Sequence, residues 1–246
     1  MMSSVFETRE AERLKKWDRY WRELPPGEGV AVWDTPAASN VGTHMSWMEP
    51  YFEKSLPVLD IGCGNGTQTA HLTGKYERVL GLEISESAVE AASEAHRHPG
   101  LEFRQFDILS DPATATLHDE LGDCNIYVRT LLHVFPKDEQ LAAAANLARL
   151  LGNTGHILIL EMPHSAGPVF EAGLNQSEDS LPKVRRNISY DVIGANLADG
   201  EIAEILDKAG IETVEHGTTL MPSTDRLSDG TALEIPLEYV LGRNHP

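Results

Sequence analysis

Residues 58–68 read VLDIGCGNGTQ, an apolar strand pattern that runs into alternate glycines and then into a helix pattern. Gly62, Gly64 and Gly66 allow the backbone to turn sharply and to approach a ligand without Cβ atoms in the way. The free N–H groups at the start of the following helix favour a carboxylate or a phosphate. The spacing predicts a ligand-binding turn, although a tight strand-to-helix turn without a ligand would use the same residues.

Acidic residues end the next two predicted strands. Glu83 closes the apolar run at 79–83, 17 positions after Gly66, where a carboxylate can accept both hydroxyls of a ribose. Asp107 ends the third strand, where it can accept from an adenine amino group while Ile108 packs on the ring. Open α/β sheets bind ligands at the carboxyl ends of their strands, so we expect the turn and both carboxylates to form one site.

Short apolar runs alternate with helix patterns from residue 57 onward, and this spacing predicts βαβ units with a parallel sheet. The expected strands are 58–61, 79–82, 101–106, 126–128 and 157–162. The expected helices lie near 67–75, 85–97, 111–121, 137–151 and 199–209. Two further strands, at 211–221 and 234–242, flank a turn-rich stretch and predict an antiparallel hairpin at the sheet edge.

Two segments lie outside this alternation. Residues 5–24 predict an amphipathic helix, because apolar residues recur at three- and four-residue steps: Leu14, Trp17, Tyr20, Trp21 and Leu24. A second short helix is expected near 46–54, and residues 163–198 are too long and too apolar for a plain connector. We therefore expect an N-terminal helical cap or lid over 1–56, and a main domain over 57–246 with an inserted cap near 163–198.

The ordered set of glycines and carboxylates resembles the class I S-adenosylmethionine-dependent methyltransferases of the small-molecule type. The first motif of that family, acidic-x-Gly-x-Gly-x-Gly, is matched by Asp60 and the three glycines. The resemblance implies a Rossmann-like, seven-stranded mixed sheet with its last strand antiparallel and helices on both faces. It implies S-adenosylmethionine as cofactor and S-adenosylhomocysteine as product. The residues expected to contact the cofactor are Asp60, Gly62, Cys63, Gly64, Gly66, Glu83, Ile84, Asp107, Ile108, Arg129 and Trp21.

The fourth strand departs from the family pattern at its start. Many members begin that strand with Asp, whereas the candidates here are Asp123, Cys124 and Asn125. The register of this strand therefore stays open by about one residue.

Two histidines are candidates for a general base. Methyl transfer from an activated sulfonium mainly needs alignment, so a base is optional. His133 follows the fourth strand and has a side chain suited to proton transfer near neutrality, which slightly favours an oxygen acceptor. His44 is the second candidate, because in similar enzymes the segment before the first strand covers the cofactor. Structural roles for both histidines remain alternatives.

Charge and composition limit the kinds of partner and compartment that we expect for this protein. Acidic residues outnumber basic ones by 38 to 20, a formal charge of −18, which disfavours nucleic acid. The two cysteines show no paired spacing, and no apolar run suits a signal peptide or a membrane span, so we expect a cytoplasmic protein with reduced thiols. The ten histidines are scattered and predict no metal site. The expected partner is a small-molecule acceptor, and a homodimer is compatible with the sequence.

Two other functions share part of this pattern. An NAD-dependent Rossmann oxidoreductase also combines a glycine turn with an acidic strand end, but its glycines follow G-x-G-x-x-G rather than the G-x-G-x-G of this chain. A non-catalytic protein that binds S-adenosylmethionine is the second alternative, because fold alone does not fix function. Turnover of an acceptor would distinguish it from an enzyme.

Overall fold

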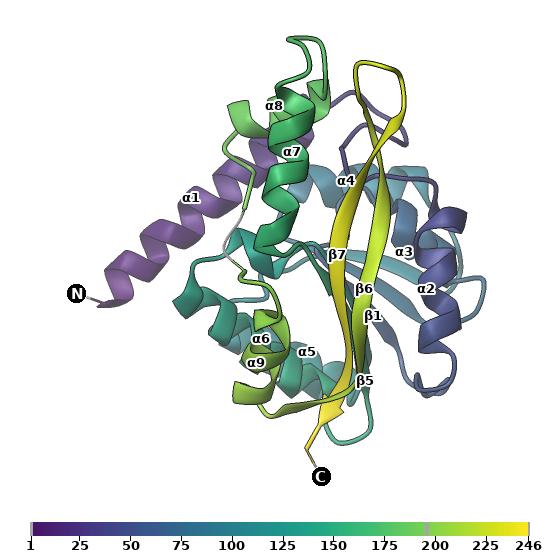
Figure 1. Ribbon diagram of the computed structural model, residues 1–246. Helices are drawn as coiled ribbons and strands as arrows, with labels where there is room; N and C mark the ends of the chain where they lie inside the picture. The colour runs from purple at the N-terminus through teal and green to yellow at the C-terminus, as the bar shows by residue number, and fades with distance from the viewer. Residues whose placement is uncertain (1, 195–196, 246) are drawn as a thin grey trace.

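A single seven-stranded sheet runs through the molecule, with helices packed on both of its faces (Figure 1). The computed structural model describes residues 2–194 and 197–245. The strand order is β3-β2-β1-β4-β5-β7-β6. The strands are β1 Val58–Ile61, β2 Val79–Glu83, β3 Leu101–Gln105, β4 Asn125–Arg129, β5 His156–Glu161, β6 Ile211–Arg226 and β7 Ala232–Asn244. The first five are mutually parallel, and β7 is antiparallel to both neighbours, as the sequence predicts.

The central strands are buried on both faces, which explains their continuous apolar runs. Leu59 and Ile61 of β1 pack in a cluster with side chains of α5, α6 and α9, whereas Val58 packs with α2 and α3 on the other face. The helices are α2 Val41–Met48, α3 Thr67–Leu72, α4 Glu86–Ala95, α5 Asp111–Leu121, α6 Lys137–Leu151 and α9 Glu201–Lys208. The expected strands β1 to β5 agree with the structure to within one residue at each end.

The N-terminal segment contains two helices, as predicted, but the second lies earlier in the chain than expected. Helix α1 spans Met2–Glu23 and packs against α4. The second helix, expected near 46–54, is α2 at Val41–Met48, preceded by the short η1 turn at Ala37–Ser39. Pro50 explains the earlier end, because proline has no N–H with which to continue the helical hydrogen bonds.

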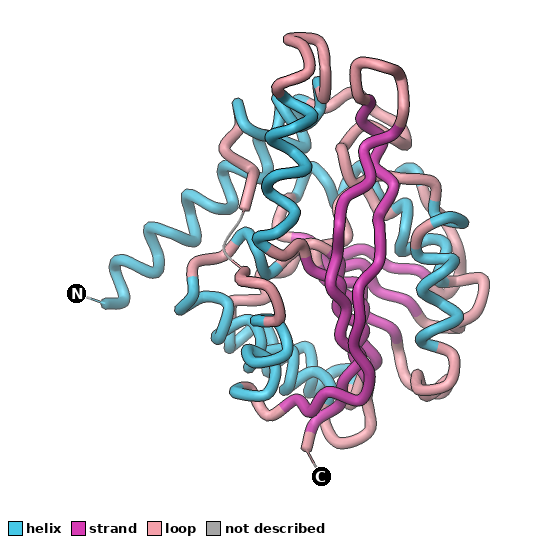
Figure 2. Tube along the Cα trace, in the orientation of Figure 1, coloured by secondary structure: helices cyan, strands magenta, loops and turns pink. Residues whose placement is uncertain are grey.

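The inserted segment forms helices beside the β6–β7 hairpin. It contains η3 His164–Ala166, α7 Gly167–Leu174 and α8 Pro182–Ser189, while residues 195–196 of the expected cap lie outside the described part of the chain. The hairpin is longer than predicted, and α7 and α8 flank its upper end (Figures 1 and 2). Asp225 Oδ2 on β6 accepts from the N–H groups of Lys183 and Val184, which joins the first turn of α8 to the hairpin.

The register of the fourth strand is settled by Asn125, which begins β4 opposite Val58. Its fully buried side chain donates from Nδ2 to the Glu53 carbonyl at 2.8 Å. Its Oδ1 accepts from the N–H of His156 at 3.3 Å, so the amide joins β4 to two other segments. Asparagine supplies both a donor and an acceptor here, whereas an aspartate would supply acceptors only.

Asn125→Asp should therefore destabilise the fold. The change removes the donor to Glu53 and buries a carboxylate against a carbonyl, at a cost of about 2–3 kcal/mol. Thermal unfolding should show the melting temperature falling by ~4–12 °C, whereas Asn175→Asp at an exposed helix end should change it much less. Equal melting temperatures for the two variants would contradict this role.

Candidate active site

A cavity of about 400 Å³ lies at the carboxyl ends of the central strands. Segments far apart in the sequence meet around it: α1, the loop after it, the glycine turn, the ends of β2 and β4, α7, α8 and the hairpin. Nine of the predicted site residues line this cavity: Trp21, Gly62, Cys63, Glu83, Ile84, Asp107, Ile108, Arg129 and His133. Four others do not line it: His44, Asp60, Gly64 and Gly66.

The glycine turn has the left-handed backbone that its residues favour. Gly62, Gly64 and Gly66 have φ angles of 77°, 54° and 78°, a region that side chains with a Cβ rarely adopt. A Cβ on Gly64 would lie 2.6 Å from the ring of Trp21, so the indole of α1 rests directly on the turn. Trp21 therefore covers Gly64, which explains why this glycine does not line the cavity.

Two carboxylates hold the turn in place. Glu83 accepts from the N–H groups of Gly64 and Ser85, both at 3.1 Å, and burial raises the pKa of Glu83. Asp60 lies on the inner side of the turn, where it accepts from Thr69 Oγ1 at 2.6 Å. Burial raises the pKa of Asp60 to about 6. Glu83 thus faces the cavity, whereas Asp60 connects β1 to α3 behind the turn.

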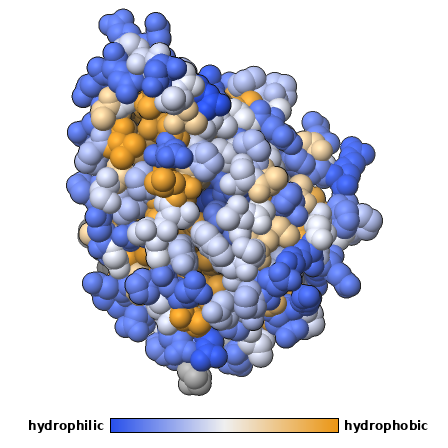
Figure 3. Space-filling view, turned by 45° about the vertical axis from the view of Figure 1, so that its right-hand side comes forward, coloured by the Kyte–Doolittle hydropathy of each residue, from blue (hydrophilic) through white to orange (hydrophobic). Residues whose placement is uncertain are grey.

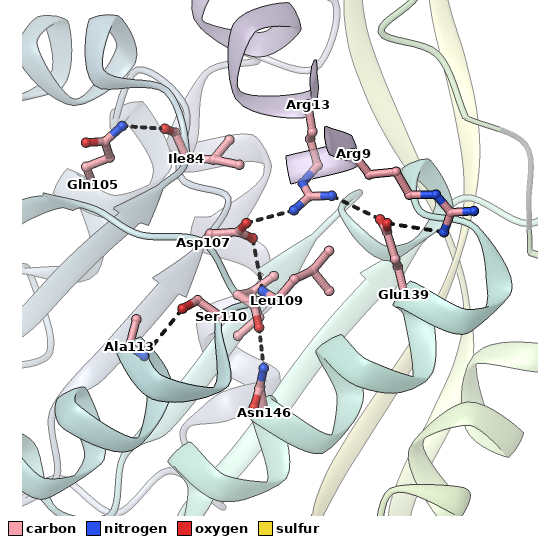
Figure 4. A network of polar contacts seen from close by, with 11 residues as sticks. Arg9, Arg13, Ile84, Gln105, Asp107, Leu109, Ser110, Ala113, Glu139 and Asn146 are labelled. Carbon is pink, nitrogen blue, oxygen red and sulfur yellow. Dashed lines mark hydrogen bonds and ion pairs between the residues drawn. The ribbon is translucent and has the colours of Figure 1, made fainter. Parts of the chain in front are cut away.

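Asp107 forms an ion pair that the sequence did not reveal. Arg13 of α1 donates to Asp107 Oδ2 at 2.7 Å and to Glu139 Oε2 at 3.0 Å. Figure 4 shows Arg13 between the two carboxylates, with Arg9 beyond Glu139. The side chains of Arg13, Asp107 and Glu139 are at most 13% exposed, so the pairs are largely shielded from water.

His133 is held by a buried carboxylate at the cavity wall. Its Nδ1 lies 2.9 Å from Glu161 Oε2. Glu161, at the end of β5, also accepts from the N–H groups of Leu131, Leu132 and His133. These bonds fix the turn after β4, where Thr130 has a left-handed φ of 56°, a conformation that costs a β-branched residue about 1–2 kcal/mol. The histidine ring is thus oriented by a carboxylate that no sequence motif indicated.

His44, the second candidate base, lies away from the cavity and is not brought to the reacting centre. It is buried on α2, with Nδ1 2.9 Å from the hydroxyl of Tyr127 and its ring against Trp47. Burial and the charge of Arg129 lower the pKa of His44 to about 3, so it is neutral at pH 7. The structure supports a packing role for this residue.

Two basic side chains of α8, Lys183 and Arg185, are bonded to backbone carbonyl groups. Lys183 donates to the carbonyls of Gly29 and Thr224, and Arg185 donates to carbonyls that include Leu174. Cys63 and Cys124 are free and buried, and burial raises the pKa of both thiols.

In residues 2–194 and 197–245, no cluster of acidic, histidine or cysteine side chains could hold a metal ion. Likewise, no helix in these ranges is long and apolar enough to cross a membrane.

Arg13→Met should loosen α1. The change leaves Asp107 and Glu139 without their shared cation, and loss of a hydrogen bond to a charged group costs about 1.5–3 kcal/mol. Amide hydrogen exchange over residues 9–23 should become ~10- to 100-fold faster. Arg22→Met is the control, because Arg22 pairs with Asp18 at the surface of the same helix. Equal exchange in both variants would show that aromatic packing alone holds α1.

Comparison with known proteins identifies the domain. A family model described as a methyltransferase domain matches residues 58–155. N-demethylindolmycin N-methyltransferase of Streptomyces griseus is 30% identical over 136 residues, covering 52% of this chain and 54% of that protein. Juvenile hormone acid O-methyltransferase of Bombyx mori is 29% identical over 167 residues, covering 64% of this chain and 57% of that protein. The chain thus spans little more than half the length of these two relatives.

A solved structure extends the likeness to nearly the whole chain. A SAM-dependent methyltransferase from Anabaena variabilis has a TM-score of 0.87 and 26% identity, covering 94% of this chain and 95% of that chain. Most of the N-terminal segment and of the inserted helices is therefore included. The family match, the relatives and the shared fold agree that this chain contains a methyltransferase domain with the class I fold, and the cofactor of such domains is S-adenosylmethionine.

Proposed function

We propose that this chain transfers the methyl group of S-adenosylmethionine to a small-molecule acceptor with an apolar body. The observation that carries the proposal is that two sets of residues line the cavity, which we assign to a donor half and an acceptor half. The donor half combines the glycine turn with two carboxylates: Gly62, Cys63, Glu83, Ile84, Asp107 and Ile108. The other half is mainly apolar: Val32, Trp33, Met162, Phe170, Leu174, Val184, Met221 and Ile235. An apolar pocket with few polar groups is typical of small-molecule sites.

The residues of the donor half match the parts of the cofactor in their chemistry and in the sequence of strands that carry them. Glu83 supplies carboxylate oxygens for the ribose hydroxyls, and Asp107 supplies an acceptor for the adenine amino group beside the apolar Ile108. The glycine turn leaves room for the methionine part, with Asp60 and Gly66 shaping the turn from behind. When bound, the cofactor supplies an activated methyl group on a sulfonium, so the protein needs mainly to align the acceptor and exclude water.

The N-terminal segment and the inserted helices are proposed to form the acceptor pocket and its lid. Arg13 and Trp21 are eight positions apart on α1, which is about 12 Å along a helix. One helix thus reaches from Asp107 at the adenine end to Gly64 at the glycine turn. Tyr20 donates to Asn187 of α8 at 2.9 Å, so α1 also joins the inserted helices. Opening of α1 would expose the donor half.

His133 is proposed as the general base for an oxygen acceptor. It lines the cavity after β4, and Glu161 fixes its ring through Nδ1. A carboxylate beside an imidazole orients the ring and stabilises its protonated form after it takes a proton. The names of the two curated relatives include an N- and an O-methyltransferase, so the choice of oxygen rests on this pair alone.

Calorimetric titration tests the donor. We expect S-adenosylmethionine and S-adenosylhomocysteine to bind at one site per chain, and Gly64→Val to abolish binding. A valine there would collide with the ring of Trp21 and disfavour the left-handed backbone, so both the glycine turn and the indole that covers it would shift. Binding of NAD in place of both ligands would instead support the oxidoreductase. Tight donor binding without turnover of any acceptor would support a non-catalytic protein.

His133→Ala tests the base. With an acceptor found by screening, turnover should fall by ~10²–10⁴-fold while the affinity for S-adenosylhomocysteine stays nearly unchanged. His216→Ala on exposed β6 is the control. Loss of affinity together with turnover would indicate a structural role. Near-normal turnover across the pH range would remove His133 from the mechanism and leave alignment as the catalytic device.

A further inference from the structure

Asn187 of α8 brings a hydrogen-bond donor without a protein partner to the cavity wall. The residue lines the cavity and is only 4% exposed. Its Oδ1 accepts from the Tyr20 hydroxyl at 2.9 Å, whereas its Nδ2 has no hydrogen-bond partner in the described part of the chain. Protein atoms enclose the unpartnered Nε of Arg13 and Oδ1 of Asp34, but they leave Nδ2 of Asn187 open. An unpaired amide donor that is shielded from bulk water is costly, so it points to a missing ligand group.

The hydroxyl of Tyr20 determines which end of the amide is free. Tyr20 is 1% exposed, and burial raises the pKa of its hydroxyl, so the O–H group stays protonated and needs an acceptor. Among the described residues, Asn187 Oδ1 is its only hydrogen-bond partner. If the amide were turned round, the O–H hydrogen of Tyr20 would be buried without an acceptor. The free end of the amide is therefore the N–H donor and not the carbonyl oxygen.

Aromatic packing holds the tyrosine, and through it the amide, in one orientation. The ring of Tyr20 contacts the rings of Trp17, Trp21, Trp33 and Tyr190, with centroid distances of 5.8, 5.7, 5.8 and 5.6 Å. Three of these contacts are edge-on and the one with Trp33 is tilted, arrangements that stabilise aromatic pairs. The donor of Asn187 thus has a fixed direction before a ligand binds, which lowers the cost of recognition.

The surroundings of this donor are apolar. Val184 and Ile188 lie near Asn187 on α8, and Trp17 and Trp33 line the same cavity. None of these four side chains can accept a hydrogen bond of ordinary strength, so the ligand must bring the acceptor atom itself. Transfer into apolar surroundings costs a carboxylate far more than a carbonyl group, and the chain already has a formal charge of −18. A neutral carbonyl oxygen therefore fits the site best.

We propose that Asn187 recognises the methyl acceptor by donating from Nδ2 to a neutral carbonyl oxygen on its apolar body. This inference rests on the proposed function and narrows the substrate class to apolar molecules that carry such an oxygen. The carbonyl group orients the molecule, while a separate atom receives the methyl group. Because methyl transfer depends mainly on alignment, a fixed hydrogen bond at this wall sets which molecules are aligned.

Matched probes that differ in one polar group test the proposal. Indane has no polar atom, 1-indanone adds a neutral carbonyl group, and indane-1-carboxylate carries a carboxylate. Each is titrated by NMR into the full isotope-labelled chain, with S-adenosylhomocysteine at saturation to fill the donor half. Asn187→Asp keeps an acceptor for Tyr20 but removes the amide donor, and Asn187→Leu removes both. The controls are Asn153→Asp and Asn153→Leu, because Asn153 is exposed and does not line the cavity.

The quantity to compare is the dissociation constant of indane divided by that of 1-indanone. The two probes differ in their transfer from water, but this difference cancels when the ratio is compared between the unmodified chain and a variant. We expect the ratio to fall about 3- to 10-fold in Asn187→Asp and Asn187→Leu, the usual worth of one neutral hydrogen bond, and to stay constant in the controls. 1-Indanone should also move the side-chain amide signal of Asn187 downfield, whereas indane should not.

Other results overturn the proposal. An unchanged ratio in both Asn187 variants would mean that water satisfies the amide. A downfield shift with S-adenosylhomocysteine alone would place Asn187 in the donor half, and a larger loss for indane-1-carboxylate than for 1-indanone would mean that the group recognised is charged. If Asn187→Leu does not fold, Asn187→Asp decides, because Tyr20 keeps its acceptor. The proposed function fails separately, since in that case the unmodified chain does not bind S-adenosylhomocysteine.

Discussion

β1 pairs in parallel with β2 on one side and with β4 on the other, and all three strands end at the same edge of the sheet. This pairing brings the glycine turn, Glu83 and Arg129 together, although they are far apart in the sequence. Parallel strands need long crossover connections, so the sheet must be covered by helices on both faces. The carboxyl ends of these strands are not covered by the crossover helices. Instead, the N-terminal helix α1 and the inserted helices α7 and α8 enclose them (Figure 1).

The sequence predicted the centre of the fold better than its margins. Strands β1, β2, β4 and β5 carry strong apolar patterns because they are largely buried, and the bounds of β1 to β5 were confirmed to within one residue. The hairpin strands were expected to be shorter, since much of β6 is exposed and carries little apolar signal. The second helix was misplaced because its end depends on Pro50 and on packing against α3. The start of β4 required the tertiary contacts of Asn125.

The sequence also located only those site residues that lie close to a recognisable local pattern. The glycine turn, Glu83 and Asp107 were found because each lies next to a strand end, so the signal is local. Arg13 is 94 positions from its partner Asp107, and Glu161 is 28 positions from His133. No spacing rule relates such pairs before the fold brings them together. His44 was proposed from its place in the N-terminal segment, and the fold buries it against Tyr127, outside the cavity.

Charge connects the site to the rest of the molecule. The face drawn in Figure 3 is largely hydrophilic, and the chain has 18 more acidic than basic residues. The residues that line the cavity are also more often acidic than basic. Four of them carry a carboxylate and two, Arg13 and Arg129, carry a guanidinium group. A sulfonium donor with a zwitterionic amino-acid end has a net positive charge, whereas its demethylated product has none. An acidic protein therefore attracts the donor more strongly than the product, a difference that favours exchange after each transfer.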